Sequence, residues 1–263
     1  MLRRSLALLS LAASVAAGQG DSVPKTLFTR RDGLVAAGFL AGSVVISHFD
    51  PKIARFFSDT TLAHVRQGDR FDHAFTHINE TTLTLAGIAT YGIGRLTKSQ
   101  ALTDIAFHTT EAIVTSSLAS QVIRGPLGRS RPRETNMDDQ YDFHWFQGFG
   151  NFKYRAFPSI HSASGFAAAT ALVEETRLRS PGNVKFIAPI LYALALTPGL
   201  SRMYLQQHWA SDIFAGAFMG TLAGEKVVRY SHSHPGNRFQ DFFVPRASNI
   251  SAHGFGLTWS AEF

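Results

Sequence analysis

The sequence of 263 residues contains no cysteine, which excludes a disulfide framework, a thiolate metal site and a cysteine nucleophile. Charged residues are scarce as well, at 17% against roughly 25% in a typical soluble domain. The residues AVILMFWYC make up 45% of the chain and 22 further residues are glycine, which argues against both a disordered chain and a coiled coil. The composition therefore lies between that of a soluble globular protein and that of a membrane protein.

The formal net charge of +6, with a sequence pI of about 9.8, suits an anionic substrate or an anionic surface. No dense cluster of lysine and arginine is interleaved with aromatic residues, so we expect no nucleic-acid partner.

The N-terminus has the pattern of a secretory signal peptide. Arg3 and Arg4 precede an apolar run from Leu6 to Ala17, and small residues follow it. We therefore expect a signal peptide over residues 1–18 and an exported, periplasmic protein. The alternative is that this segment remains as an anchor and the protein is integral to the inner membrane.

Helical patterns dominate the rest of the chain and predict an all-α fold, a compact helical bundle over residues 19–230. A tail follows over 231–263, where short alternating stretches after Phe242 favour a β-hairpin. Gly125-Pro126 is expected to end one helix, and Pro189 and Pro198 are expected to break another. The predicted helices cover residues 34–47, 83–96, 104–123, 159–177, 184–200 and 205–229.

The two most apolar segments, 34–47 and 184–200, are shorter than the roughly 20 residues that a membrane crossing needs. We therefore expect a bundle outside the membrane that associates at most with its surface. A bundle of short, tilted membrane helices is the alternative.

Three spaced motifs carry the candidate chemistry. The last of them is Ser201-Arg202, five residues, His208, three residues and Asp212. The spacing of four places His208 and Asp212 on one face of the predicted helix, where the carboxylate fixes the imidazole tautomer and leaves the other nitrogen as a nucleophile or base. The guanidinium of Arg202 suits two oxygens of a phosphate.

The middle motif, Phe157-Pro158-Ser159-Ile160-His161, opens an alanine-rich helix. Ser159 is expected to be the N-cap, and the free N–H groups of the first turn offer a site for an anion. His161 then lies beside a bound phosphate, where a histidine can act as a general acid.

The first motif supplies two more cations, Arg124 and Arg131, the latter followed by Pro132. Three arginines, a helix N-terminus and two histidines suit a tetrahedral oxyanion. No cluster of acidic residues accompanies them, so we expect a site without a metal ion or another cofactor.

These three motifs resemble those of the type 2 phosphatidic acid phosphatases, a superfamily shared with bacterial acid phosphatases and vanadium haloperoxidases. The resemblance covers residues 124–212 and implies phosphate ester or diphosphate hydrolysis. It implies that His208 forms a phosphohistidine, that Asp212 orients it and that His161 protonates the leaving oxygen. It further implies phosphate binding by Arg124, Arg131, Arg202, Ser159 and the backbone N–H of Ile160.

Two residues depart from the family pattern. Arg124 replaces the usual lysine, and Ile160 replaces the usual glycine, so that a branched side chain is expected to crowd the entrance. Two other functions stay open: a vanadate-dependent haloperoxidase, and a non-catalytic helical protein of the envelope or membrane. Phosphorylated small molecules and lipid phosphates are both candidate substrates.

An aromatic loop, residues 134–157, separates the first two motifs and contains eight phenylalanine, tyrosine and tryptophan side chains. The functional interpretation is an apolar wall above the site for a lipid tail or an aromatic leaving group. The alternative is ordinary packing of a long loop.

Overall fold

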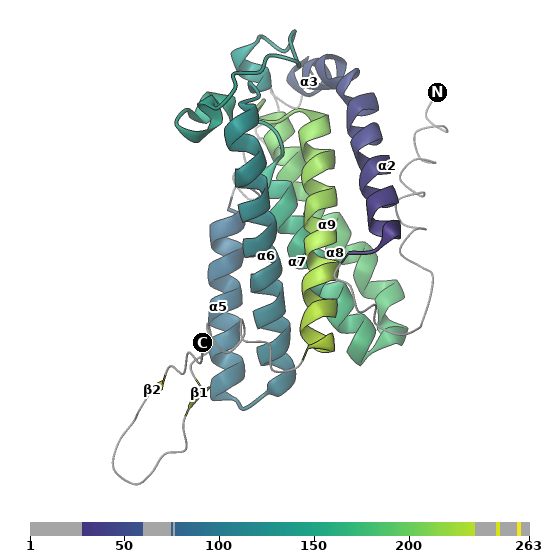
Figure 1. Ribbon diagram of the computed structural model, residues 1–263, viewed down its shortest axis with the longest axis vertical. Coiled ribbons are helices and arrows are strands. Elements are labelled where there is room, and N and C mark those ends of the chain that lie inside the picture. Colours follow the sequence, from purple (N-terminus) through teal and green to yellow (C-terminus); the bar gives the residue numbers. More distant parts are fainter. Residues whose placement is uncertain (1–27, 60–74, 76, 235–245, 248–256, 259–263) are drawn as a thin grey trace.

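The computed structural model describes residues 28–59, 75, 77–234, 246–247 and 257–258 (Figure 1). The predicted signal peptide, residues 1–18, lies outside the described residues. Seven α-helices run through the described part of the chain: α2 (Arg30–Ser47), α3 (Asp50–Asp59), α5 (Glu80–Leu96), α6 (Gln100–Leu127), α7 (Ile160–Arg179), α8 (Val184–Tyr204) and α9 (Ala210–Ser233). Short 3-10 helices are η2 (Pro132–Glu134), η3 (Gln147–Phe149), η4 (Phe152–Tyr154) and η5 (Pro181–Asn183).

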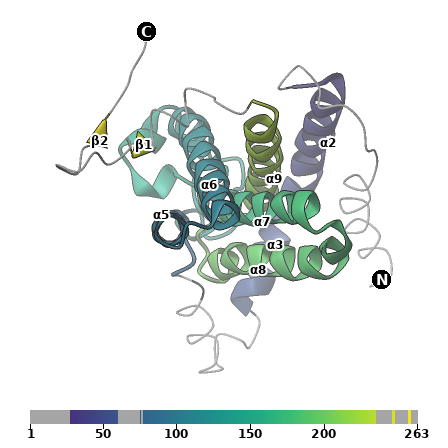
Figure 2. The ribbon, with the colours of Figure 1, turned by 90° about the horizontal axis from the view of Figure 1, so that it is seen from below.

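The fold is the predicted all-α bundle, with α7 at its centre. Viewed along the bundle, α7 lies between α6 and α9 on one side and α8 on the other (Figure 2). Small side chains allow this packing: Ala112, Ala167, Ala171 and Val228 form a fully enclosed cluster where α6, α7 and α9 meet. Outside the bundle, β1 (Arg246–Ala247) pairs antiparallel with β2 (Leu257–Thr258), in the segment for which the sequence favoured a hairpin.

Polar side chains fix where the helices begin. Thr29 and Asp32 form a capping box at the start of α2, and Asn79 and Thr82 form another at the start of α5. Ser159 accepts a hydrogen bond from the backbone N–H of Ser162 and caps α7, as the sequence predicted.

The prediction that Gly125-Pro126 ends a helix was wrong by one turn. α6 continues to Leu127 and includes Pro126 in its last turn, two residues before the Gly128 C-cap. The helix ends at Gly128, which adopts a left-handed conformation with φ of 60° and donates its N–H to the carbonyl of Arg124. A side chain at Gly128 would collide with the carbonyl of His144.

The expected breaks at Pro189 and Pro198 are also absent, and α8 is continuous over 21 residues. Pro198 cannot donate to the carbonyl of Leu194, but the hydroxyl of Thr197 donates to that carbonyl at 2.7 Å. The helix is therefore longer than the sequence-based estimate, and it is long and apolar enough to cross a membrane. A second candidate span is the bent pair of α2 and α3.

The last helix starts later than predicted, at Ala210 rather than at residue 205. Asp212 causes this start, because its carboxylate accepts the backbone N–H of Trp209 at 2.7 Å and caps the first turn. His208 consequently precedes the helix. The expectation from the spacing of four, that His208 and Asp212 share one helical face, was therefore wrong.

Candidate active site

The fold brings all the predicted site residues together at one end of the bundle. They come from the end of α6, the following loop, the start of α7, the end of α8, and the turn before α9 together with the first turn of α9. His161 is partly buried, and the others are at least nine-tenths buried: Arg124, Arg131, Ser159, Ile160, Arg202, His208 and Asp212. The branched side chain of Ile160 is 4% exposed, so it is enclosed rather than placed at an open entrance.

Two histidines form the centre of the site. The rings of His161 and His208 lie 6.0 Å apart, centroid to centroid. The Nδ1 atom of His208 lies 2.7 Å from the carbonyl oxygen of Ala156. A carbonyl only accepts hydrogen bonds, so Nδ1 carries the proton and Nε2 has a free lone pair.

The expectation that Asp212 hydrogen-bonds His208 was wrong. The Oδ2 atom of Asp212 is 3.7 Å from Nδ1 of His208, beyond hydrogen-bond distance, because the main-chain carbonyl of Ala156 occupies that position. Asp212 instead accepts from Arg129, whose Nη1 lies 2.5 Å from Oδ1. Its charge remains close enough to stabilise an imidazolium at His208 electrostatically.

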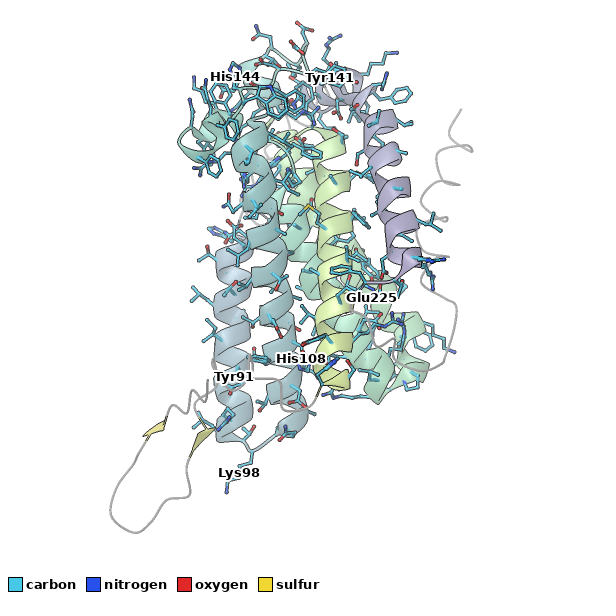
Figure 3. The ribbon with its side chains drawn as sticks, in the orientation of Figure 1. Tyr91, Lys98, His108, Tyr141, His144 and Glu225 are labelled. Atoms are coloured by element: carbon cyan, nitrogen blue, oxygen red, sulfur yellow. The ribbon has the colours of Figure 1, made fainter. Side chains whose placement is uncertain are left out.

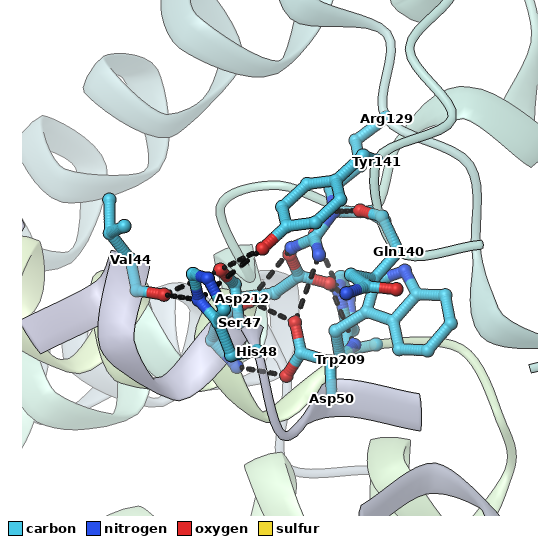
Figure 4. Close-up of polar contacts among 12 residues, drawn as sticks. Val44, Ser47, His48, Asp50, Arg129, Gln140, Tyr141, Trp209 and Asp212 are labelled. Atoms are coloured by element: carbon cyan, nitrogen blue, oxygen red, sulfur yellow. Dashed lines mark hydrogen bonds and ion pairs between the residues drawn. The ribbon is translucent and has the colours of Figure 1, made fainter. Parts of the chain in front are cut away.

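Arg129 joins two buried carboxylates, and sequence reasoning missed this role. Its Nη2 atom donates to Asp50 at 2.9 Å while Nη1 donates to Asp212 (Figure 4). Asp50 also accepts the backbone N–H and the hydroxyl of Ser211. Burial raises the pKa of Asp212, and the Arg129 guanidinium opposes that rise. This network ties the start of α3 to the start of α9 behind His208.

Three arginines make the site strongly cationic. Arg131 and Arg202 both donate to the side-chain oxygen of Gln207, at 3.2 and 3.3 Å, and Arg124 donates to the carbonyl of Arg155 at 2.6 Å. Burial and the neighbouring arginines lower the pKa of Arg124 to about 10 and that of Arg131 to about 9. Both remain protonated at neutral pH, and their mutual repulsion is relieved by a bound anion.

Buried donors without acceptors point to the same ligand. Within the described residues, the Nε atoms of Arg124 and Arg131 are buried and have no hydrogen-bond partner. Unmatched buried donors are costly unless an anion or water accepts from them. Together with the start of α7, they suit an oxyanion with several oxygens.

The environment keeps both histidines neutral before an anion binds. Burial, followed by the charges of Arg131 and Arg124, holds the pKa of His208 well below its usual value. Burial, followed by Arg202, does the same to the pKa of His161. Glu80, the first residue of α5, was not anticipated: its Oε2 lies 4.0 Å from Nε2 of His161 and favours the protonated form of that ring.

The aromatic loop covers this end of the bundle, as Tyr141 and His144 show in Figure 3. The side chain of Phe152 stacks on Arg131, with 3.6 Å between the guanidinium carbon and the ring centroid. Phe149 contributes to a hollow on the outer side of α6 that Val122, Gly125 and Arg155 also line. Several loop aromatics are exposed: Tyr141, Phe143, Trp145, Phe146, Phe149 and Phe152.

A family profile described as the PAP2 superfamily matches residues 106–234, which contain all three motifs. The chain belongs to the PAP2 superfamily. A segment of 70 residues is 40% identical to the Lipid A 1-phosphatase of Porphyromonas gingivalis. That segment is 27% of this chain, and it spans only 15% of the relative's length.

A transmembrane PAP2-type phosphatidylglycerolphosphate phosphatase from Bacillus subtilis matches with a TM-score of 0.41 and 18% identity. The match covers 74% of this chain and 98% of that structure.

Proposed function

We propose that this PAP2 protein is a phosphatase that hydrolyses lipid phosphate monoesters or diphosphates through a phosphohistidine on His208. The observation that carries the proposal is the hydrogen bond from Nδ1 of His208 to the carbonyl of Ala156, which leaves Nε2 as a lone-pair donor beside the arginines. Arg124, Arg131, Arg202 and the N–H groups at the start of α7, including that of Ile160, bind the phosphate oxygens.

The reaction proceeds in two displacements. In the first, Nε2 of His208 attacks phosphorus, the bond to the leaving oxygen breaks, and His161 donates a proton to that oxygen. The arriving phosphate raises the proton affinity of His161, and Glu80 supports its charged form. The phosphorylated His208 ring is cationic, and its Nδ1–H remains on the Ala156 carbonyl.

In the second displacement, a water molecule attacks the phosphohistidine. Neutral His161 accepts a proton from the water, the bond from phosphorus to Nε2 breaks, and inorganic phosphate leaves. Arginines stabilise the charge on the transferred group in both steps, which is the task that a divalent metal performs in many other phosphoryl-transfer enzymes. No step needs a metal ion.

A lipid substrate is supported by the surface of the bundle. Each of six helices has a central stretch without a charged residue: 33–47, 81–94, 112–123, 162–173, 186–201 and 213–224. Large apolar side chains are exposed there, such as Leu40 on α2, Ile88 on α5, Leu118 on α6 and Ile190 on α8. Exposed apolar side chains on several helices at the same level of the bundle suit lipid tails. We therefore propose a bundle lodged in the membrane, the alternative that the sequence-based helix lengths had disfavoured.

A substrate panel tests the proposal. Phosphate release is measured from a long-chain phosphatidate in mixed micelles and from a soluble aryl phosphate, with and without EDTA. We expect faster release from the lipid, no loss in EDTA and competition by vanadate. Loss of activity in EDTA that a divalent cation restores would contradict the mechanism, and equal rates on both substrates would contradict the lipid preference.

A further inference from the structure

A second cluster of titratable side chains lies at the opposite end of the bundle from the arginines. His108 of α6, Glu175 of α7 and His232 of α9 meet there, and one ligand atom of each lies within 4.8 Å of the others. The Oε1 atom of Glu175 is 2.5 Å from Nδ1 of His108 and 3.0 Å from Nε2 of His232. Figure 3 shows His108 far from Tyr141 and His144.

The donor set matches that of a transition metal. Two imidazoles and one carboxylate on three different elements are typical ligands of Zn²⁺ and of related divalent ions. His108 and Glu175 are almost fully buried, with side chains 5% and 1% exposed, whereas His232 is 35% exposed and gives a route from solvent. Two ligand atoms of one tetrahedral zinc ion lie roughly 3.3 Å apart, so Nδ1 of His108 and Oε1 of Glu175, at 2.5 Å, would separate slightly when the ion binds.

The surroundings of Glu175 resemble the outer shell of a metal site. Its second oxygen, Oε2, contacts Arg179, which also lies 3.4 Å from Oδ2 of Asp104. A guanidinium in this position orients the carboxylate and leaves Oε1 directed at the two histidines.

The local charge also favours a cation. Glu175, Asp104 and Glu111 are the carboxylates near this cluster, and among the described residues Arg179 contacts two of them, Glu175 and Asp104. Glu111 lies one turn from His108, and its Oε2 is buried without a hydrogen-bond partner in the described part of the chain. A divalent ion would offset the excess of carboxylates over cations at this position.

We propose that His108, Glu175 and His232 bind one divalent transition-metal ion that links α6, α7 and α9 at the end remote from the phosphate site. The ion takes no part in phosphoryl transfer, so this site is independent of the proposed function. A hydrogen-bonded network without a metal is the competing interpretation.

Zn²⁺ titration of the purified full chain, in detergent and after treatment with a chelator, tests the proposal. We expect one tightly bound equivalent by calorimetry and elemental analysis, and binding roughly tenfold or more weaker in His232→Gln. His234→Gln is the matched control, because His234 lies two residues further on and stacks on Tyr230 instead. His161→Gln also retains the site and excludes binding at the other end.

Two further measurements distinguish the loss of the metal site from misfolding of the variant. Zn²⁺ should raise the Tm of the wild type but not that of His232→Gln, and Co²⁺ should give a visible spectrum typical of nitrogen and oxygen ligands only in the wild type and the controls. Absence of saturable binding in the wild type, or equal affinity in His232→Gln, would overturn the proposal. Phosphate release by the metal-free chain is measured in parallel, so that failure of the phosphatase assignment is seen separately.

Discussion

At the scale of single residues, His208, the proposed nucleophile, is held by the main chain rather than by a carboxylate. His208 donates to Ala156, and Asp212 is held at 3.7 Å by Arg129 and by its capping bond to Trp209. The backbone carbonyl sets the tautomer, while Asp212 supplies negative charge for the proposed phosphoimidazolium. The two tasks that one aspartate was expected to perform are therefore divided.

The charge of Arg131 should set the acid limit of activity. His208 must be neutral to attack, and Arg131 helps to hold its pKa below the usual value, so protonation of His208 should not reduce kcat/KM as pH falls through 6.5. In Arg131→Gln the pKa of His208 should rise, so the acid limb of the profile of kcat/KM against pH should move to higher pH. KM should also rise, because a proposed phosphate ligand is lost. Full pH profiles check this.

Arg95→Gln is the control for that shift, because Arg95 lies at the far end of α5. Its profile should match that of the wild type. An unchanged acid limb in Arg131→Gln would show that the arginine does not act on His208.

Arg129 should matter for both stability and turnover. Arg129→Gln leaves Asp50 and Asp212 buried without their shared cation, and breaking such a buried pair costs about 3–5 kcal/mol. We expect a lower free energy of unfolding in denaturant titrations and a lower kcat with little change in KM. Arg133→Gln, an exposed arginine nearby, is the control and should change stability by less than about 1 kcal/mol. Similar losses in both variants would contradict a specific role of Arg129.

The sequence predicted which residues lie together in the candidate site better than it predicted the residues that support them. Arg124, His161 and His208 could be found because each lies in a short motif whose spacing reflects one turn or one helix start. Asp50 and Arg129 are separated by 79 residues, and their contact depends on how α3 packs against the loop after α6. No local pattern encodes such a contact.

At the scale of elements, α7 and α9 each carry site residues and pack backbone to backbone. Gly216, Gly220 and Gly224 lie four residues apart on α9, and a Cβ at Gly220 would come within 2.1 Å of the carbonyl of Ala163. This close contact fixes His161 of α7 relative to Asp212 of α9.

Gly220→Ala should therefore separate the two helices. Overpacking of this kind costs about 1–3 kcal/mol, and we expect a lower Tm and reduced kcat. Gly92→Ala on α5 is the matched control, because nothing lies within 4 Å of its Cβ position, and alanine there should leave Tm unchanged or raise it. Thermal unfolding of both variants tests this prediction. An unchanged Tm in Gly220→Ala would show that the contact between α7 and α9 is loose.

Helix lengths were the least predictable feature of the elements. Proline in the sequence predicts the end of a helix, but α6 includes Pro126 in its final turn. In α8, the hydroxyl of Thr197 supplies the hydrogen-bond donor that Pro198 lacks. The usual rules for helix ends in a sequence do not consider that a neighbouring hydroxyl can replace the N–H donor that a proline lacks. The error mattered, because it made α8 too short to cross a membrane.

At the scale of the whole molecule, charges concentrate at the two ends of the bundle and leave an apolar layer between them. We expect the protein to stay in the membrane pellet after carbonate washing, because its exposed apolar surface would otherwise face water. Fractionation with N-terminal sequencing checks both this location and the predicted processing near residue 18. Release into the carbonate supernatant would contradict a bundle lodged in the membrane.

The most direct test of the central claim is to trap the covalent intermediate. Rapid acid-free quenching of a reaction with a ³²P-labelled substrate, followed by peptide mapping, should place a base-stable, acid-labile label on His208. With a substrate whose leaving group needs no protonation, His161→Gln should accumulate the label, because the variant lacks the base for the second displacement. His208→Gln should carry no label and lose nearly all turnover. Turnover of wild type without any labelled enzyme, or a label that persists in His208→Gln, would contradict the account.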